Sequence, residues 1–430
     1  MRTFPCLVLL TLAFNPAPAQ TLPAVLSLDQ ALDTALSRHG EMEAAQAAVD
    51  ATQGALRQAG YSPNPTLHFQ TENWRFTGTP GFSPGQELDV FAFVSQPIET
   101  GGKKQQRVEF AAADRRIAEA QREVVRWRIR RDVRSAYLRA EAAQRKESLL
   151  QESRGTFERL RNYHEIRVDH GAMPEVNLIK VELEAEKVEM ALAAAQMETE
   201  RAKIDLLRAM GVSDPSQQFT IEDTRAAEPT ASWDNPSFAA SLLDAATANR
   251  PDMLLAEALV ERARAATGVQ RAAARPDVTP YFGYKRSGPY NTLVGGITLP
   301  LPLRNRNTGA IEQTIAEVHQ QEASLRATRA RVQAEVTAAL AGVRRRARML
   351  NAVETRLMQR AQTTSQITLA AYQEGGIELL EVLDAQRSQI ETGLLRSQIL
   401  YDYQLSRIEL ESAIGTDAVS LSGGVERAAN

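Results

Sequence analysis

The feature of this sequence that most constrains its fold is a long segment without proline. Residues 103–168 contain no proline and a single glycine, Gly155. An α-helix rises 1.5 Å per residue, so the segment predicts a rod of about 100 Å, longer than one globular core requires. Its narrow apolar stripe predicts helices packed side by side with wet faces on either side, although an ordinary antiparallel coiled coil remains an alternative. The stripe consists of Val125, Ile129, Val133, Ala136, Ala140 and Ala143.

The chain is also a tandem duplication of about 200 residues, which must be recognised before a fold is assigned. Segments 171–211 and 375–415 align at an offset of 204 residues, whereas Pro97 and Pro300 align at an offset of 203. Further upstream, each half has a methionine 23 residues before the proline that closes its helical stretch; these pairs are Met42 with Pro65 and Met253 with Pro276.

Both halves predict the same order of elements, namely a helix, two strands and two long helices. The first half, residues 20–211, is expected to contain helices at 28–60, 103–168 and 175–210 and strands at 67–76 and 88–96. The second half, residues 237–415, is expected to contain helices at 237–274, 311–373 and 378–414 and strands at 278–286 and 292–299. A linker over 212–236 and a tail over 416–430 complete the chain.

The N-terminus has the pattern of a secretory signal peptide over residues 1–19. Arg2 precedes an apolar run, and Ala17 and Ala19 form a small-residue cleavage site. Cys6 is the sole cysteine and precedes the apolar run, so it is not expected to be lipidated and leaves with the signal. A buried N-terminal strand is the alternative. No other segment approaches 18 consecutive apolar residues, so no transmembrane helix is expected and export is predicted.

The four predicted strands raise the question of what closes their sheet. Each has about 9 to 10 residues, the length that crosses a bilayer at a tilt in an outer-membrane barrel. Four strands cannot close a barrel, and open edges in lipid cost several kcal/mol for each unpaired backbone group. Either the strands are soluble, or several chains share one barrel, and three chains would supply an allowed total of 12 strands.

Charge and motifs exclude several functional classes. A net charge of −3 gives no electrostatic case for binding nucleic acid. Phosphate-loop, nucleophile-elbow and zinc-protease motifs are absent, so an enzyme is not expected. The histidines do not have the spacing of a metal site, which needs three or four converging ligands, so neither a metal nor a cofactor is predicted. They are expected on the surface: His39, His68, His164, His170 and His319.

Three motifs resemble those of the TolC family of outer-membrane efflux proteins. Residues 372–386 resemble the family's second periplasmic tip turn, and residues 95–104 and 299–302 resemble its strand-to-helix transitions. The resemblance implies a mostly α chain that contributes strands to a membrane β-barrel. Three copies would form a 12-stranded barrel in the lipid of the outer membrane above a 12-helix α-barrel crossing the periplasm. It also implies that a periplasmic adaptor protein docks this homotrimer to an inner-membrane pump.

Residues 95–104 resemble more narrowly the CzcC-like branch, which serves pumps of the resistance-nodulation-division class that export heavy-metal cations. Drug efflux and type I protein secretion remain alternatives. So does a periplasmic coiled-coil adaptor, although an adaptor has one helical hairpin and two are predicted here. The resemblance would place the linker and the tail around the waist of the tunnel.

The tip turns supply the candidate site residues. The resemblance implies that Glu381 and Asp384 line the pore constriction, where three-fold carboxylate rings favour cations. They lie three residues apart on one helix face, and a solvated acidic face is the alternative. The first-half counterparts, Asn177 and Lys180, carry no acid, and Ile377 stands where some family members have an arginine. The tip turns themselves are assigned to Gly171, Pro174, Tyr372, Gly375 and Gly376.

Overall fold

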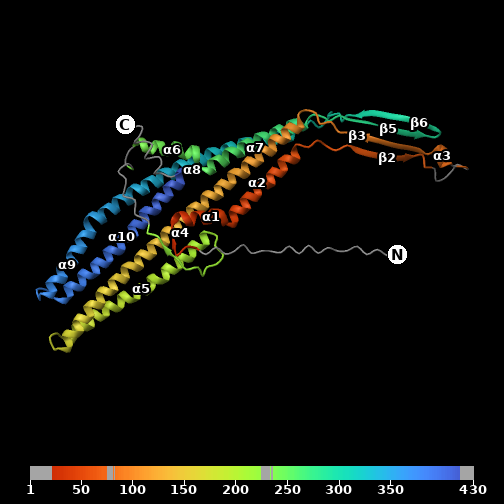
Figure 1. Ribbon diagram of the computed structural model, residues 1–430. Coiled ribbons are helices and arrows are strands. Elements are labelled where there is room, and N and C mark those ends of the chain that lie inside the picture. Colours follow the sequence, from red (N-terminus) through yellow and green to blue (C-terminus); the bar gives the residue numbers. More distant parts are fainter. Residues whose placement is uncertain (1–21, 75–80, 82, 224–232, 234–235, 417–430) are drawn as a thin grey trace, which may run out of the picture.

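The computed structural model describes residues 22–74, 81, 83–223, 233 and 236–416. The molecule is long and slender, with a bundle of helices that narrows at one end into a small sheet and at the other into two helical hairpins (Figure 1). The prediction of a mostly α chain with long helices and a few strands is therefore confirmed. The predicted signal peptide and most of the predicted tail lie outside the described residues.

Each half of the chain contributes four helical stretches. The first half forms α1 (Leu28–Arg38), α2 (Gly40–Ala59), α4 (Lys103–Asp169) and α5 (Glu175–Ala209), besides the short α3 (Pro84–Glu87). The second half forms α6 (Pro236–Asn249), α7 (Pro251–Ala273), α8 (Thr308–Ala352) continued by η2 (Val353–Met358) and α9 (Gln359–Gln373), and α10 (Leu379–Ile414). No helix of the described residues is both long enough and apolar enough to cross a membrane.

The helices expected over 28–60 and 237–274 are wrong as single helices, because each is broken once. His39 has an extended conformation (φ −66°, ψ 122°) between α1 and α2, and its Nδ1 accepts a hydrogen bond from the Glu41 N–H. Arg250 has nearly the same conformation (φ −66°, ψ 127°) between α6 and α7. The cause at Arg250 is local, since the following Pro251 disfavours the helical conformation at the residue before it.

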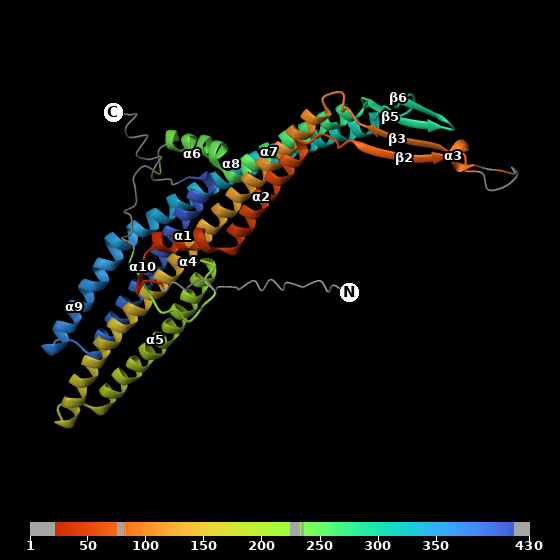
Figure 2. The same cartoon turned by 45° about the vertical axis from the view of Figure 1, so that its right-hand side comes forward.

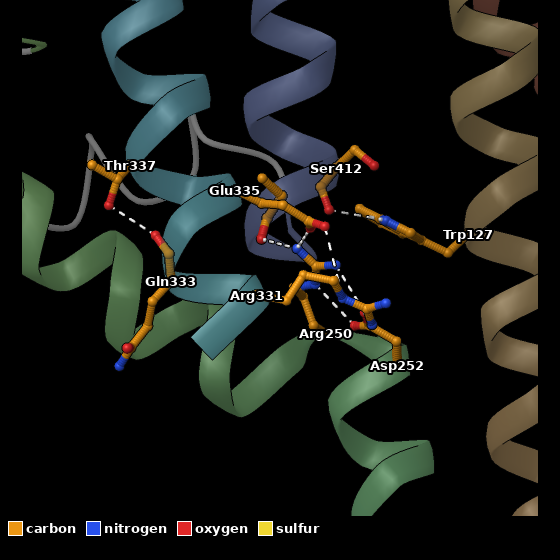
Figure 3. Close-up of polar contacts among 9 residues, drawn as sticks. Trp127, Arg250, Asp252, Arg331, Gln333, Glu335, Thr337 and Ser412 are labelled. Carbon is orange, nitrogen blue, oxygen red and sulfur yellow. Dashed lines mark hydrogen bonds and ion pairs between the residues drawn. The ribbon is translucent and has the colours of Figure 1, made fainter. Parts of the chain in front are cut away.

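Ion pairs hold the break at Arg250 in place. The guanidinium contacts Asp252 (2.8 Å) on its own helix and Glu335 (2.6 Å) on α8, and it donates to the Ala413 carbonyl of α10 (3.1 Å). Figure 3 shows Arg250 between the two carboxylates, with Arg331 beside them. Arg250 is only 9% exposed, and a buried cation requires such partners. This cluster joins the start of α7 to α8 and α10.

The strands differ in length from those expected. β2 (Thr66–Glu72) and β3 (Asp89–Ser95) have 7 residues each, shorter than the 67–76 and 88–96 expected, whereas β5 (Thr279–Ser287) and β6 (Tyr290–Thr298) have 9 each. β2 ends because Asn73 takes the left-handed conformation (φ 66°). They form one antiparallel sheet in the order β2-β3-β5-β6.

A second, two-stranded sheet was not predicted. β1 (Val25–Leu26) pairs in parallel with β4 (Thr220–Ile221), which lies in the expected linker. The Tyr137 hydroxyl of α4 lies 3.0 Å from the Leu26 carbonyl and 2.9 Å from that of Glu222, so this small sheet is held against the middle of the longest helix.

The second long helix differs from the first by a π-helical segment. α4 runs through 67 residues without a break, whereas η2 separates α8 from α9. A π turn closes hydrogen bonds over five residues and so holds one residue more than an α turn. The offset between the halves is 203 residues before η2 and 204 after it. The π segment thus accommodates the single extra residue of the second half.

The core is distributed along the bundle around α4, which packs against α2, α5, α7 and α10 (Figure 2). One cluster lies under α6, α8 and α10, and a second joins α1, α4, α5 and the small sheet. A third links the tips of the two hairpins, α4–α5 and α9–α10. The sheet and the hairpin tips therefore lie at opposite ends of one continuous rod.

Candidate functional site

The four-stranded sheet presents an apolar face to the surroundings. In one cross-strand row Leu67 faces Val94, which faces Phe282, and in the next Phe69, Ala92, Tyr284 and Leu293 are aligned. The large side chains of this face are between 41% and 74% exposed. They form a contiguous apolar surface, which a soluble monomer rarely exposes. Its members are Leu67, Phe69, Val94, Phe282, Tyr284, Leu293 and Ile297.

The opposite face of the sheet is polar and aromatic. His68 Nε2 lies 2.8 Å from the Ser95 hydroxyl, and its ring stacks on Phe93 at 4.6 Å. The Lys285 ammonium lies 4.8 Å from the centre of the Phe91 ring. Apolar and polar side chains thus alternate over Thr66–Gln70 of β2, the pattern of strands that separate lipid from a wet interior, whereas Val90–Val94 of β3 is apolar throughout.

Both edges of this sheet are open. Within the described chain, the outer edges of β2 and β6 pair with no further strand. The edge groups cannot remain unpaired in lipid, where each costs several kcal/mol. Open edges of this kind are sites at which another chain can add a strand.

At the other end of the molecule, two similar turns close the hairpins. Gly171 (φ 69°) directly follows the C-cap of α4, and Gly375 (φ 79°) directly follows the C-cap of α9, both in the left-handed conformation that favours glycine. Pro174 is the N-cap of α5, directly before its first helical residue. The Gly376 N–H donates to the Ala371 carbonyl (2.9 Å) and completes the second turn.

Tyr372 connects the two hairpins through a buried histidine. Its hydroxyl lies 2.8 Å from His164 Nε2, and His164 Nδ1 lies 2.7 Å from the Leu160 carbonyl. Because a carbonyl only accepts, Nδ1 carries the proton, and Nε2 accepts from the tyrosine hydroxyl. Burial lowers the pKa of His164, and the charge of Arg167 lowers it further. The imidazole is therefore neutral and forms the acceptor side of this bond.

The predicted constriction residues lie together on α10, and only one of them is paired. Glu381 and Asp384 are both exposed, and among the described residues the Glu381 side chain has no partner. Asp384 lies 3.3 Å from Arg387 Nη1. Arg387 donates two bonds to Glu184 of α5 (2.5 and 2.8 Å), and these lower the pKa of Glu184 to about 2 against the opposing effect of burial. Glu381 is thus the less neutralised of the two carboxylates.

The sequence reasoning missed three residues of this tip. His164 was expected on the surface, which is wrong, because it is fully buried; its i, i+4 spacing to the apolar Leu160 was the available signal. Glu184 and Arg387 join helices of different hairpins, and no local pattern marks such a pair. Ile377 packs partly buried against the apolar cluster of the tip, so this position contributes packing where an arginine would contribute charge.

No group of three or more metal-binding side chains occurs among the described residues.

Comparison with known proteins decides the family. A family model described as "Outer membrane efflux protein" matches residues 31–212 and 242–416, which is well over half of the chain. The chain belongs to the outer membrane efflux protein family. It is a transport protein and not an enzyme. The family model matches two separate segments, one in each half of the sequence.

Individual relatives cover most of the chain at modest identity. The cobalt-zinc-cadmium resistance protein CzcC of Cupriavidus metallidurans is 27% identical over 367 residues, 84% of each chain. The pyoverdine export outer membrane protein OpmQ of Pseudomonas putida is 23% identical over 414 residues, which are 90% of this chain and 85% of OpmQ. A crystal structure of CusC superposes with a TM-score of 0.71 at 20% identity, covering 94% of this chain and 95% of that one, and shows the same fold.

Proposed function

We propose that three copies of this chain form the outer-membrane exit duct of a tripartite efflux system of the resistance-nodulation-division class, which exports heavy-metal cations. The sheets would close into one 12-stranded barrel in the outer membrane, and the helices into a 12-helix tunnel across the periplasm. The single observation that carries this proposal is the open-edged sheet with one exposed apolar face. A shared barrel satisfies both features, because it covers the apolar face with lipid and pairs every edge.

The exposed side of α5 supports a shared tunnel. Large apolar side chains recur there every seven residues, the spacing of a helix that packs lengthwise on another helix. They are between 49% and 77% exposed, and a row of exposed apolar side chains along the length of a helix needs a partner. Neighbouring subunits would supply that partner. The residues are Val176, Leu183, Met190, Met197 and Ile204.

The substrate class rests on the relatives and on charge. CzcC is named for cobalt, zinc and cadmium resistance, and the match covers 84% of this chain. The exposed carboxylates of Glu381 and Asp384 would form three-fold acidic rings at the narrow end of the tunnel, and such rings favour cations. The match to a pyoverdine exporter, over 90% of the chain, supports an organic substrate as the second candidate.

The partners of the proposed duct are a periplasmic adaptor and an inner-membrane pump. The hairpin tips would face them, because they lie at the end of the rod opposite the sheet (Figure 1). An adaptor identity for the chain itself is less consistent with two hairpins, each preceded by a pair of strands.

Fractionation and genetics test the proposal together. The chain should be found in the outer-membrane fraction as a trimer that resists mild detergent, whereas a soluble periplasmic monomer would contradict it. Deleting the gene should raise the sensitivity of the cells to cobalt, zinc or cadmium. It should have a smaller effect on their sensitivity to antibiotics and on the accumulation of siderophores. Complementation with the intact gene serves as the control. A deletion strain sensitive only to organic compounds would favour the second candidate.

A further inference from the structure

A cavity lies between the two hairpins near their tips. It has a volume of about 270 Å³, and its walls come from α4 of the first hairpin and from α9 and α10 of the second. The two hairpins lie side by side in both views of the molecule (Figures 1 and 2). An apolar cavity of about 150 Å³ holds a benzene molecule, so this one has room for one or two aromatic rings.

The walls of this cavity are apolar and aromatic. Phe157 and Leu160 belong to α4, whereas Leu369 and Tyr372 belong to α9. The rings of Tyr163 and Tyr372 meet edge to face, with their centroids 6.4 Å apart. Aromatic rings attract a further ring in offset-stacked or edge-to-face geometry. The walls therefore suit a flat aromatic molecule.

A single charge is present at the cavity. Among the described residues that line it, Arg159 is the only charged one. Its side chain is exposed, and its Nη2 donates to the Thr156 hydroxyl (3.0 Å). Within the described ranges of the chain, Arg159 has no carboxylate partner. A guanidinium binds a carboxylate through charge-assisted hydrogen bonds that are often bidentate, so this residue suits an anionic group at the mouth of the cavity.

We propose that this cavity binds an aromatic carboxylate of one or two rings. The rings lie between the walls formed by α4 and α9, and the carboxylate accepts hydrogen bonds from Arg159. Inorganic anions lack an apolar part that could contact the walls, and organic cations are repelled by the guanidinium. The site goes beyond the proposed export function, and its binding test does not depend on that function.

A ligand in this cavity contacts both hairpins at once. Tyr372 belongs to the wall and also bonds through its hydroxyl to His164 of the other hairpin (2.8 Å). A molecule that binds only the joined arrangement of the hairpins stabilises that arrangement by mass action. Aromatic carboxylates should therefore hold the two tips together and raise the unfolding temperature of the chain.

Calorimetric titration of the purified full chain with 2-naphthoate tests the site. Arg159→Gln should weaken binding roughly tenfold or more, as expected when a charge-assisted hydrogen bond is lost. The neutral amide of the same shape, 2-naphthamide, should bind both proteins alike. Arg161→Gln removes an exposed arginine of α4 that does not line the cavity, so this matched control should bind both compounds as the intact chain does.

Filling the cavity gives a second measurement. Leu369→Trp places a two-ring side chain in the cavity and should abolish binding of both compounds. Ile367→Trp changes a side chain of the same helix that is 62% exposed and does not line the cavity, so it should leave binding unchanged. Naphthoate should raise the unfolding temperature of the intact chain and of Ile367→Trp, but not that of Leu369→Trp.

Two results would overturn the proposed site, namely naphthoate binding that persists in Leu369→Trp and binding that is the same in Arg159→Gln as in the intact chain. Either result would leave the channel function intact. A chain that shows the expected pattern of binding but forms no trimer would instead contradict the proposed function and support the site.

Discussion

The two halves of the molecule have the same order of elements, but their hairpins differ. The first has an uninterrupted α4 and ends in a tip that carries Asn177 and Lys180 where the second carries Glu381 and Asp384. The second hairpin has a π-helical segment, η2, between α8 and α9. The buried anchors, His164 and Glu184, belong to the first hairpin, and their partners Tyr372 and Arg387 belong to the second. The two halves of the chain thus share one arrangement of helices, whereas each polar contact between the tips takes one residue from each half.

Single-residue deletions give the sharpest test of the difference in helix geometry. Deleting Glu152 from α4 should rotate all later residues by about 100° and remove Phe157, Leu160 and His164 from the core. Each large buried side chain contributes roughly 2 to 5 kcal/mol, so the deletion should unfold the tip. Deleting the counterpart Thr355 removes the extra residue of η2 and should be tolerated, because the helix can continue as an α-helix.

Thermal unfolding followed by circular dichroism compares the two deletions. Both residues are exposed, so neither deletion removes a buried side chain directly. Equal losses of stability in the two deletion variants would show that η2 does not accommodate an inserted residue. The correspondence between α4 and the continuous helix formed by α8, η2 and α9 would then be wrong.

The second prediction compares the strand pairs of the two halves. Phe69 of β2 and Leu293 of β6 lie in one cross-strand row of the apolar face, so arginine at either position should have the same effect. The cost for a lipid-facing arginine is about 2 to 4 kcal/mol at the bilayer centre. Gln70→Arg and Thr292→Arg, in a row of the opposite face, are the matched controls.

Recovery of the detergent-resistant oligomer from the outer-membrane fraction measures this effect. It should fall strongly for Phe69→Arg and Leu293→Arg and little for the two controls. If all four variants are recovered alike, the apolar face does not contact lipid.

Much of the architecture could be predicted because it depends on local pattern. Absence of proline marks α4, and the conformation of Arg250 follows from Pro251, a signal that was present and not used. The π segment resembles any other helical stretch in composition, and its only trace was the change of offset from 203 to 204 residues. The contact between His164 and Tyr372 spans 208 residues, so only the packed hairpins reveal it. Features set within one helix could be predicted from the sequence, whereas contacts that join two hairpins, such as that between His164 and Tyr372, could not.

The third prediction concerns Glu381 and Asp384 of the second tip, whose counterparts at the first tip are not acidic. Replacing both Glu381 and Asp384 with alanine should raise single-channel conductance and reduce blockade by divalent or trivalent cations. A carboxylate near a cation contributes about 1 kcal/mol in water, so losing several should weaken blockade on the order of tenfold or more. The single variant Asp384→Ala should change conductance and blockade less than the double variant does, because Arg387 already neutralises that carboxylate in part.

Recordings in planar bilayers check this expectation, with Lys180→Ala at the first tip as the matched control. Conductance unchanged in the double variant would show that these carboxylates line a solvated helix face and not the constriction.

The smallest expected effect is the pH dependence of the bond between the hairpins. Burial and then the charge of Arg167 lower the pKa of His164 below its ordinary value, so the folded tip binds a proton less readily than the unfolded chain. Stability should therefore be constant above about pH 6.5 and fall as the pH decreases below it, because protonation removes the Nε2 acceptor from Tyr372.

Tyr372→Phe should lower stability by about 0.5 to 1.5 kcal/mol near neutral pH. His164→Gln should flatten the acid-induced decrease, whereas His170→Gln, which removes an exposed histidine at the same tip, should leave it unchanged. Unfolding temperatures measured on both sides of pH 6.5 separate these cases, and parallel decreases in all variants would mean that His164 is not the titrating group.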